Sequence, residues 1–452
     1  MPVSAKQDNA ENHLRLIADK LESGTLHQVR NLLNALHPAE IAHVLESLKP
    51  VDREIVWRLT APERRGEILV ELNEEVRGGL IEATDIQDFI SAVGDLEHDD
   101  LADLLHDVPE VVLEQVLMSM DNQDRSRLEA VLSYDEDSAG GLMSLDTLTV
   151  RPDVTLDVVL RYLRQRAEMP DLTDSLIVVD RADHYLGVLP LSVLLTRDER
   201  RTVGELMITD VAAIPATLSA SEVAILFENR DLVSAPVVDE QHRLIGRITV
   251  DDVVDVIREE ADHSLMSMAG LDEEQDMFAP VILSTKRRAV WLGINLFTAF
   301  LASWVIGLFE ATIQQVVALA VLMPIVASMG GIAGSQTLTL VIRGLALRQI
   351  GATNAHLLMT KELAVGALNG LIWALVVATV AGVWFHHAGI GALIGGAMMI
   401  NLICAALAGA SIPLLLHRFG VDPALAGGVI LTTVTDVVGF MAFLGLATLY
   451  LV

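Results

Sequence analysis

The last apolar segment of the chain contains one acidic residue, Asp436, within the run TTVTDVVGF. The three threonines that precede it add hydroxyl oxygens to the same stretch. A carboxylate is expensive in hydrocarbon and usually faces a water-filled cavity or a partner. Hard cations such as Mg²⁺ take oxygen ligands and give up their water reluctantly. Asp436, paired with its copy across a two-fold axis, is therefore a candidate site for a hydrated divalent cation. The alternative is a protonated Asp436 that hydrogen-bonds a neighbouring helix.

A second apolar segment carries small and polar residues that are candidates to line a pore. Its sequence, PIVASMGGIAGSQTLTL, begins with Pro324, which can break a helix. Glycines there permit close packing or exposed carbonyls, and irregular backbone at membrane depth is tolerated only where protein or water satisfies it. The alternative is a packing face of small residues between helices. The candidate pore-lining residues of the two segments are Gly330, Gly331, Gly334, Gln336, Thr432 and Thr433.

A further acidic pattern, DDVVDVIREEADH, precedes the apolar segments. At helical spacings of three or four residues it places four carboxylates on one face, those of Asp252, Asp255, Glu259 and Asp262. Like charges on such a stripe repel until a cation screens them, so a helix of this kind can sense cations. The alternative is an ordinary solvated linker helix.

Membrane helices are needed to position these residues, and five stretches are long and apolar enough to cross a bilayer, which takes about 20 apolar residues. They are residues 289–309, 316–342, 363–385, 389–416 and 424–452. From residue 289 onward four Lys and Arg cancel four Asp and Glu, so the whole net charge of −30 lies on residues 1–288. A membrane domain therefore follows an acidic soluble part.

The Lys and Arg between these stretches predict the orientation, because positively charged flanks stay cytoplasmic. Cations precede the first stretch and lie in the second-to-third and fourth-to-fifth connections, whereas the other two connections contain none. The single cysteine, Cys404, excludes a disulfide framework and favours a cytosolic soluble part. We expect a multi-pass protein of the cell inner membrane with its N-terminus in the cytoplasm and its C-terminus outside.

The soluble part combines a helical array with a duplication. Residues 12–133 contain short amphipathic runs such as PAEIAHVLESL, which predict a small stack of helix pairs. Then GLMSLDTLTVRP from Gly141 aligns with ELMITDVAAIP from Glu205, and SLIVVDRADHYLGVLP aligns with SAPVVDEQHRLIGRIT. Each copy reads strand–helix–strand–turn–strand–helix, which predicts two α/β modules with a cleft between them. The start, MPVSAKQDNAENHLRL, does not predict a cleaved signal.

The two modules resemble tandem CBS domains, and the second copy ends in the T-x-x-D pattern of that family, Thr249 to Asp252. The resemblance implies a cleft that binds ATP or another adenine nucleotide, with the threonine and the aspartate holding the ribose. The first copy has Pro190 and Val193 at these positions, so at most one nucleotide site is expected. No G-x-x-x-x-G-K-[ST] occurs, so nucleotide hydrolysis is not expected.

The order of these parts resembles the MgtE family of magnesium channels over nearly the whole chain. The resemblance rests on YDEDSAGGLMS from Tyr134, TVDDVVDV from Thr249, GGIAGSQ from Gly330 and VDPAL with TTVTDVVGF from Val421. It implies a homodimer in membrane lipid with a central Mg²⁺ pathway that cytosolic Mg²⁺ closes. It also implies an acidic α-helical superhelical N domain (1–137), an α/β tandem CBS pair (138–258), a connecting or plug helix (259–287) and a transmembrane domain of five helices (288–452).

The resemblance also assigns roles to acidic residues at matching positions. Ions that bridge the cytosolic carboxylates would compact the soluble part and close the pore, by favouring one of two states. Two departures concern the pore: Ile332 stands where the family usually has asparagine, and Gly428-Val429 stands where the family commonly has Asn-Pro or Gly-Pro. The residues that match the family's acidic Mg²⁺ positions are Asp99, Asp103, Asp252, Asp255, Glu260 and, in the pore, Asp436.

Other functions fit the residues less well. An intramembrane metalloprotease needs H-E-x-x-H in a span, and none occurs, so no enzyme is expected. A chain with a net charge of −30 is not expected to bind nucleic acid. An anion channel wants cations at its site, whereas the membrane-buried charge here is acidic. Five spans exceed what a sensor with a membrane anchor needs. A CBS-regulated transporter of Co²⁺ or Mn²⁺, or a CBS-regulated secondary transporter, stays open as an alternative.

Overall fold

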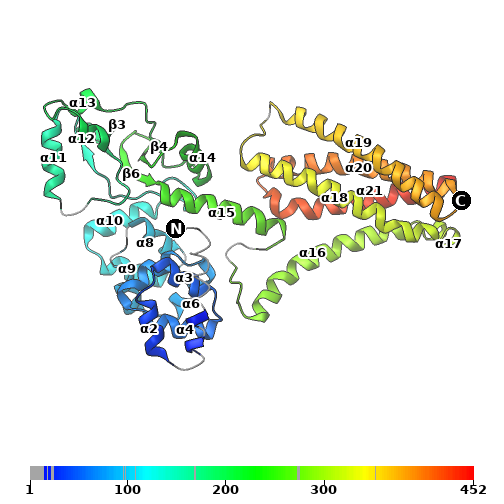
Figure 1. Ribbon diagram of the computed structural model, residues 1–452, viewed down its shortest axis with the longest axis horizontal. Helices are drawn as coiled ribbons and strands as arrows, with labels where there is room; N and C mark the ends of the chain where they lie inside the picture. The colour runs from blue at the N-terminus through cyan, green and yellow to red at the C-terminus, as the bar shows by residue number, and fades with distance from the viewer. Residues whose placement is uncertain are drawn as a thin grey trace. The chain divides into compact units, whose positions relative to one another are not determined.

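The computed structural model (Figure 1) describes residues 15–17, 19–21, 25–94, 96, 98–106, 108–166, 169–271, 275–351 and 353–451. The chain divides into two compact units, Met1–Asp262 with Glu274–Pro280, and His263–Glu273 with Val281–Val452. The predictions for the first fourteen residues and for the C-terminal residue lie outside the described part of the chain.

Short helices form the N-terminal part of the first unit, as predicted, and their starts are fixed by the sequence. Pro38 and Pro50 begin two of them, where the missing N–H of proline has no intrahelical partner to lose. Asn73 and Asp121 cap two others by accepting backbone N–H groups. The elements are α2 (Leu26–Leu33), α3 (Pro38–Glu46), α4 (Pro50–Leu59), η1 (Pro62–Arg64), α5 (Arg65–Val70), α6 (Glu74–Glu82), α7 (Ile86–Val93), α8 (His98–His106), α9 (Glu110–Ser119) and α10 (Asn122–Val131).

Two small sheets follow, and they confirm the predicted duplication. In each, the first strand is parallel to the second and the second is antiparallel to the third. Gly187 and Gly246 occupy equivalent places, and a side chain at either would collide with a backbone carbonyl. The elements are β1 (Thr149–Val150), α11 (Leu156–Gln165), β2 (Ser175–Val179), β3 (Tyr185–Pro190), α12 (Leu191–Thr196), α13 (Val203–Leu206), β4 (Ile214–Pro215), α14 (Ala220–Arg230), β5 (Ser234–Val238) and β6 (Leu244–Thr249).

The acidic stripe lies on α15 (Val250–Met268), which begins directly after β6. The acidic stripe is therefore helical, as predicted, but this helix does not continue to residue 287, the expected end of the connecting segment 259–287. The helix starts at Val250, where the Asp252 carboxylate accepts the backbone N–H of Thr249 (3.3 Å) and caps the first turn. It ends before Gly270, whose φ of +68° favours glycine, and the next helix begins only at Val281.

The second unit contains five helices that are long and apolar enough to cross a membrane, within the described residues, in agreement with the five predicted spans. Most extend beyond the predicted ends, because polar flanking residues continue the helices. Pro324, which could have broken the second span, lies inside α18 without ending it, because proline is tolerated in membrane helices where neighbouring groups satisfy the freed backbone. The helices are α16 (Val281–Gly307), the short α17 (Glu310–Gln315), α18 (Ala318–Ala346), α19 (Ala355–Trp384), α20 (Ala388–Arg418) and α21 (Pro423–Tyr450).

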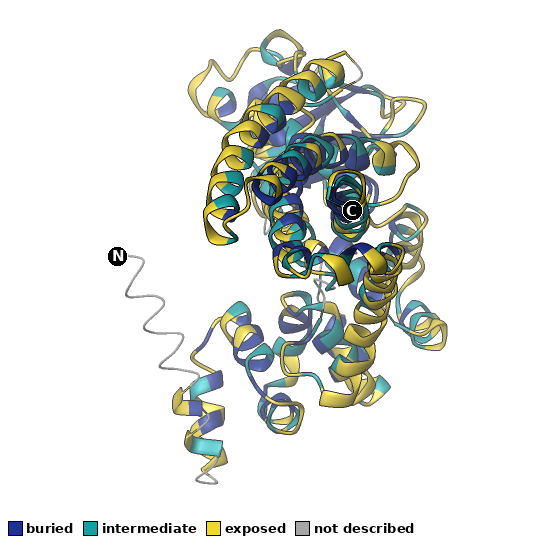
Figure 2. Ribbon diagram, turned by 90° about the vertical axis from the view of Figure 1, so that its right-hand side faces the viewer, coloured by how far each residue is buried: buried dark blue, intermediate teal, exposed yellow. Residues whose placement is uncertain are grey.

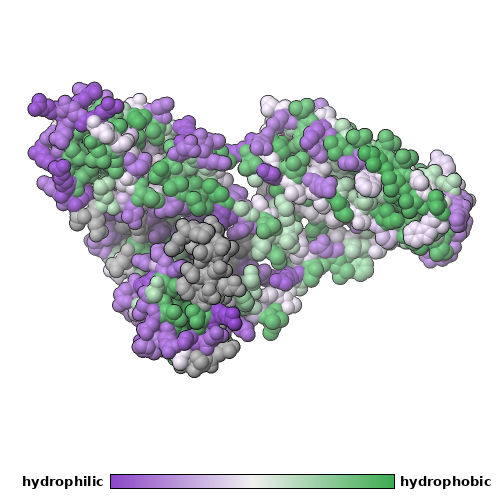
Figure 3. Space-filling view, in the orientation of Figure 1, coloured by the Kyte–Doolittle hydropathy of each residue, from purple (hydrophilic) through white to green (hydrophobic). Residues whose placement is uncertain are grey.

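Helix α20 is the core of this unit and packs against α18, α19 and α21. Small residues allow the close approach: a methyl group on Gly391 would collide with the Ala378 carbonyl of α19. Figure 2 shows buried residues on the facing sides of these helices and exposed residues on their outward sides. Hydrophobic side chains cover much of the visible surface of the membrane helices, whereas hydrophilic residues dominate the first unit (Figure 3).

Candidate cation-binding sites

A wide groove of about 770 Å³ runs between α18 and α21 in the second unit. Its walls are mostly small or polar, with one larger apolar residue, Ile332, which is 56% exposed. Asp436 is the acidic residue of this groove. The residues that line it are Ala327, Ser328, Gly331, Ile332, Ser335, Gln336, Thr339, Thr432 and Asp436.

The Asp436 side chain is half-buried on α21 and makes no hydrogen bond or ion pair within the part of the chain that the structure describes. Thr432 lies one turn earlier on the same helix and shares the groove, while its hydroxyl donates to the carbonyls of Gly428 and Val429 (3.1 Å each). The carboxylate is therefore the strongest acceptor that the groove offers. A hydrated divalent cation needs such acceptors for its water molecules.

The predicted pore-lining residues divide into two sets. Gly331, Gln336 and Thr432 lie on the groove. Gly330 and Gly334 do not line it, because side chains at these positions would collide with Asn401 and Leu431. Their small size serves helix packing, which is the alternative that the sequence left open. Thr433 does not line the groove either, and its hydroxyl donates to the Val429 carbonyl at 2.7 Å.

Asn401 is a polar residue that the sequence analysis missed. It lies on α20, is 0% exposed, and its Nδ2 donates to the Val326 carbonyl of α18 at 2.8 Å. Its amide sits between Gly330 of α18 and Gly439 of α21, the two helices that form the groove. Its buried Oδ1 has no hydrogen-bond partner among the described residues. An asparagine in the otherwise apolar run MMINLICAALAG was the available signal.

Glu362 was also missed, because the third span was predicted to begin one residue later. In the structure it is a buried residue of α19, 4% exposed. Its Oε2 accepts a hydrogen bond from Thr337 Oγ1 of α18 (3.1 Å), and its Oε1 lies 3.2 Å from Lys361 Nζ. These partners compensate for burial, so Glu362 joins two membrane helices rather than facing the groove.

In the first unit the structure brings together acidic residues from α8 and α15. Burial, together with the nearby carboxylates of Asp99 and Asp251, raises the pKa of Asp252 to about 8. Burial and the charges of Glu136, Asp100 and Asp99 raise the pKa of Asp103 to about 7. Asp99 itself is 9% exposed. Burial is the larger cause of both shifts, and the neighbouring carboxylates add to it, so a cation at this place would relieve repulsion between like charges.

The rest of the acidic stripe lies on a more open part of α15. Burial raises the pKa of Asp255, and Arg258 partly offsets this effect. Glu71 of the N domain, which was not predicted, has its pKa raised by burial and by the Asp255 charge. Glu259 and Glu260 are exposed. Among the described residues no three His, Cys, Asp or Glu side chains converge on a ready-made metal site, so a cation here would keep part of its water shell.

The two residues predicted to hold a nucleotide lie together at the start of α15. The Thr249 hydroxyl donates to Asp252 Oδ2 at 3.1 Å and also contacts the Asp251 carboxylate. Thr249 is 7% exposed. Asp252 therefore belongs to both predicted sites, since it also faces the acidic residues of α8. A cation and a ribose would compete for the same carboxylate.

Three family models match the chain. They are the divalent cation transporter model MgtE over residues 323–446, the MgtE intracellular N domain over residues 36–137, and the CBS domain over residues 139–198 and 203–259. They cover the membrane helices that form the groove, the helical array and the two sheets.

Curated relatives are similar over nearly their full lengths. The magnesium transporter MgtE of Thermus thermophilus is 32% identical over 442 residues, which is 96% of this chain and 98% of that protein. The magnesium transporter MgtE of Bacillus subtilis is 28% identical over 95% of this chain and 96% of that protein. A solved structure, the cytosolic domain of the Mg²⁺ channel MgtE in complex with ATP, is 32% identical, with a TM-score of 0.49 over 53% of this chain and 98% of that one.

Proposed function

Since the chain belongs to the MgtE family of magnesium transporters, we propose that it carries Mg²⁺ across the membrane along the groove between α18 and α21. The observation that carries this proposal is Asp436, a carboxylate on the groove without a hydrogen bond or ion pair among the described residues. Mg²⁺ dehydrates reluctantly, so the ion passes with its water shell, which the carboxylate and neighbouring hydroxyls accept. A transporter of this kind needs no catalytic residue.

A second copy of the chain completes the pathway in this proposal. The groove is open along its length and contributes one carboxylate, and a closed pore of the same residues follows if two grooves face each other across a two-fold axis. A homodimer then presents two copies of Asp436 to one ion. Membrane lipid covers the apolar outward faces of α16 and α19, many of whose large side chains are exposed.

Cytosolic Mg²⁺ closes this pathway through the acidic residues of the first unit. The Asp99 charge acts on both Asp103 and Asp252, and burial with like charge raises the pKa of these two residues. A divalent cation between them replaces repulsion by attraction and favours the compact state. Asp255, Glu259 and Glu260 continue the acidic surface along α15, and supply further contacts for partly hydrated ions.

An adenine nucleotide such as ATP is a second regulator in this proposal. The CBS modules, with Thr249 and Asp252 at the end of the second, support a single site. Because Asp252 also faces the acidic residues of α8, nucleotide and Mg²⁺ compete for it. Such a link would connect transport to the state of the nucleotide pool.

The protein is a multi-pass membrane protein. Within this proposal it lies in the cell inner membrane with the N-terminal unit in the cytoplasm, because the connections that contain Lys or Arg all lie on the side of that unit. The C-terminus is then outside.

Transport of other divalent cations is the second candidate. It is favoured by Ile332, an apolar side chain on the groove at a position where a polar group would add a ligand for ion-bound water. Purified protein in liposomes, tested with Mg²⁺, Mn²⁺, Co²⁺ and Ca²⁺ in turn, separates the two. Selective flux of Mg²⁺ supports the first candidate, and equal flux of Co²⁺ or Mn²⁺ supports the second.

The same liposomes test the role of Asp436. We expect Asp436→Ala to abolish Mg²⁺ flux, because no other acidic side chain lines the groove within the described residues. Glu310→Gln, a change in the exposed α17, is the matched control and keeps wild-type flux. Correct insertion of both variants is checked by their protease pattern. Full flux through a correctly inserted Asp436→Ala would refute the assignment.

A further inference from the structure

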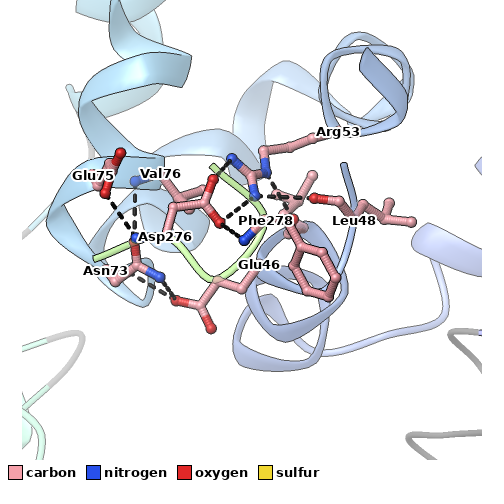
Figure 4. Close-up of polar contacts among 9 residues, drawn as sticks. Glu46, Leu48, Arg53, Asn73, Glu75, Val76, Asp276 and Phe278 are labelled. Carbon is pink, nitrogen blue, oxygen red and sulfur yellow. Dashed lines mark hydrogen bonds and ion pairs between the residues drawn. The ribbon is translucent and has the colours of Figure 1, made fainter. Parts of the chain in front are cut away.

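The N domain holds a short segment of chain, residues 275–278, through a buried ion pair (Figure 4). Arg53 of α4 faces Asp276: Nη1 donates to Oδ2 at 2.8 Å and Nη2 donates to Oδ1 at 3.0 Å. The two side chains are 7% and 5% exposed. This is the bidentate geometry in which a guanidinium recognises a carboxylate most specifically.

Contacts within the N domain orient the Arg53 side chain independently of Asp276. Arg53 also donates to the backbone carbonyls of Leu45 (2.8 Å) and Leu48 (3.0 Å), both within the N domain, so its guanidinium is already oriented. Glu75 accepts the backbone N–H of Asp276 at 2.8 Å. The site therefore contacts both the side chain and the main chain of Asp276. It is a receptor for one peptide segment rather than a chance surface contact.

A contribution to stability alone explains this pair poorly. The cost of removing two charges from water can exceed their attraction, so apolar residues of similar size often serve a fold as well. What a buried bidentate pair supplies is selectivity for one partner and a large penalty for losing only one member. The function of this pair therefore depends on which segment of the chain carries Asp276.

Asp276 lies in the connection between α15 and the membrane helix α16. Asp276 follows the end of α15 and precedes Val281, the first residue of the membrane helix α16. The CBS modules reach this region through α15, which continues directly from β6. The N domain reaches it independently, through the contacts of Arg53 and Glu75 with Asp276. Two routes thus run from the first unit to α16, and one of them bypasses the CBS modules.

We propose that Arg53 and Glu75 form a receptor on the N domain for Asp276, and that this contact transmits movement of the N domain to α16. The inference rests on the proposed closure by cytosolic Mg²⁺. When Mg²⁺ draws the N domain toward α15, the receptor carries the chain just before α16 with it. When the pair is broken, the N domain still binds Mg²⁺ but acts on the membrane helices only through α15.

Full-length protein in liposomes tests the receptor. Asp276→Asn removes the charge of the segment, and the double variant Arg53→Ala/Asp276→Ala removes both charges together with the packing between them, so that no unpaired charge stays buried if the single variant fails to fold. Arg58→Ala is the matched control, because Arg58 lies on the same helix in an exposed pair with Glu54. For each protein, hydrogen exchange over residues 275–280 is measured together with the Mg²⁺ concentration that halves the flux.

We expect both receptor variants to exchange roughly tenfold faster at the backbone amide of residue 276, which donates to Glu75 in the wild type and loses this protection when the segment leaves the N domain. We expect them to need about threefold more Mg²⁺ for half-inhibition, with unchanged flux when inhibitory Mg²⁺ is absent. Arg58→Ala should match wild type. Unchanged exchange would overturn the contact, and faster exchange with wild-type Mg²⁺ dependence would overturn its role in coupling. A wild-type protein that Mg²⁺ does not inhibit would instead contradict the proposed regulation.

Discussion

Carboxylates of two kinds occur in this chain, and their surroundings suit them to different tasks. Asp436 is half-buried on a groove, without a hydrogen bond or ion pair among the described residues, so it can hold an ion through water and release it. Asp252 and Asp103 are crowded by other carboxylates and retain protons near neutral pH. A site that conducts must bind weakly, whereas a site that regulates must bind well enough to change a conformation.

The proposed regulation by Mg²⁺ should depend on pH, because the pKa values of its carboxylates are raised. At pH 7 Asp252, with a pKa of about 8, is mostly protonated, so Mg²⁺ must displace a proton to bind. Raising the pH from about 6.5 to about 8.5 should therefore lower the half-inhibiting Mg²⁺ concentration by roughly tenfold, since the competing proton is lost. Flux assays at the two pH values measure this shift. Asp252→Asn should remove most of it, and an equal shift in that variant would contradict the assignment.

The buried amide of Asn401 gives a prediction about the shape of the groove. Its Nδ2 holds the Val326 carbonyl, next to groove residues of α18, while its unpaired Oδ1 costs roughly 1–3 kcal/mol. Asn401→Leu should therefore fold at least as well as wild type, yet change the ratio of Mg²⁺ to Mn²⁺ flux, because the wall loses this restraint. Cys404→Ala on the same helix is the control. If the ratio of Mg²⁺ to Mn²⁺ flux is unchanged in Asn401→Leu, Asn401 serves helix packing and does not shape the groove.

Among single residues, the acidic candidates could be predicted from the sequence, but the residues that pack against them or against the groove helices could not. The motif around Asp436 and the acidic positions on α8 and α15 are local patterns or family resemblances, and in the structure the Asp99 charge acts on both Asp252 and Asp103. Whether Gly330 faces a groove or another helix depends on Asn401, which lies far along the chain. No local pattern contains that information.

Helices whose position depends on hydropathy were predicted correctly, whereas helix ends that depend on single hydrogen bonds or caps were not. Twenty apolar residues dictate a membrane helix, so all five spans were found. Their ends were not, because α16 continues through Lys286, Arg287 and Arg288. The acidic stripe on α15 was predicted to be helical, but the end of this helix at Met268 and the break before Val281 were not predicted.

The close contact of α19 and α20 predicts the effect of adding one methyl group. On Gly391 it would meet the Ala378 carbonyl, which belongs to a helix backbone and cannot turn away. Gly391→Ala should therefore destabilise the membrane unit by about 1–3 kcal/mol, as overpacking typically does. Gly445→Ala is the matched control, since nothing lies within 4 Å of a methyl group there. Thermal unfolding in detergent measures both, and equal midpoints would show that the two helices separate easily.

For the whole molecule, composition alone separates the two kinds of domain. All of the net charge lies before residue 289, and the hydrophobic spans lie after it, so the division into a soluble and a membrane part needed no structure. The way the N domain engages residues 275–278 could not be predicted. It depends on Arg53 and Asp276, two ordinary charged residues that lie 223 positions apart. Neither position has a local signature.

The orientation of the whole chain follows from the asymmetric distribution of its cations, and cysteine labelling tests it. In a Cys404→Ser protein, single cysteines replace exposed residues in four connections: Glu310, Gln349, His386 and His417. Because Lys and Arg keep their flanks cytoplasmic, a membrane-impermeant thiol reagent added to intact cells should label positions 310 and 386 only. Permeabilised cells, in which all four positions react, provide the control. Labelling of position 349 or 417 in intact cells would reverse the orientation, and with it the face on which Mg²⁺ meets Asp252 and its neighbours. The acidic unit would then sample external rather than cytosolic Mg²⁺, so this labelling also decides which pool of the ion can regulate transport.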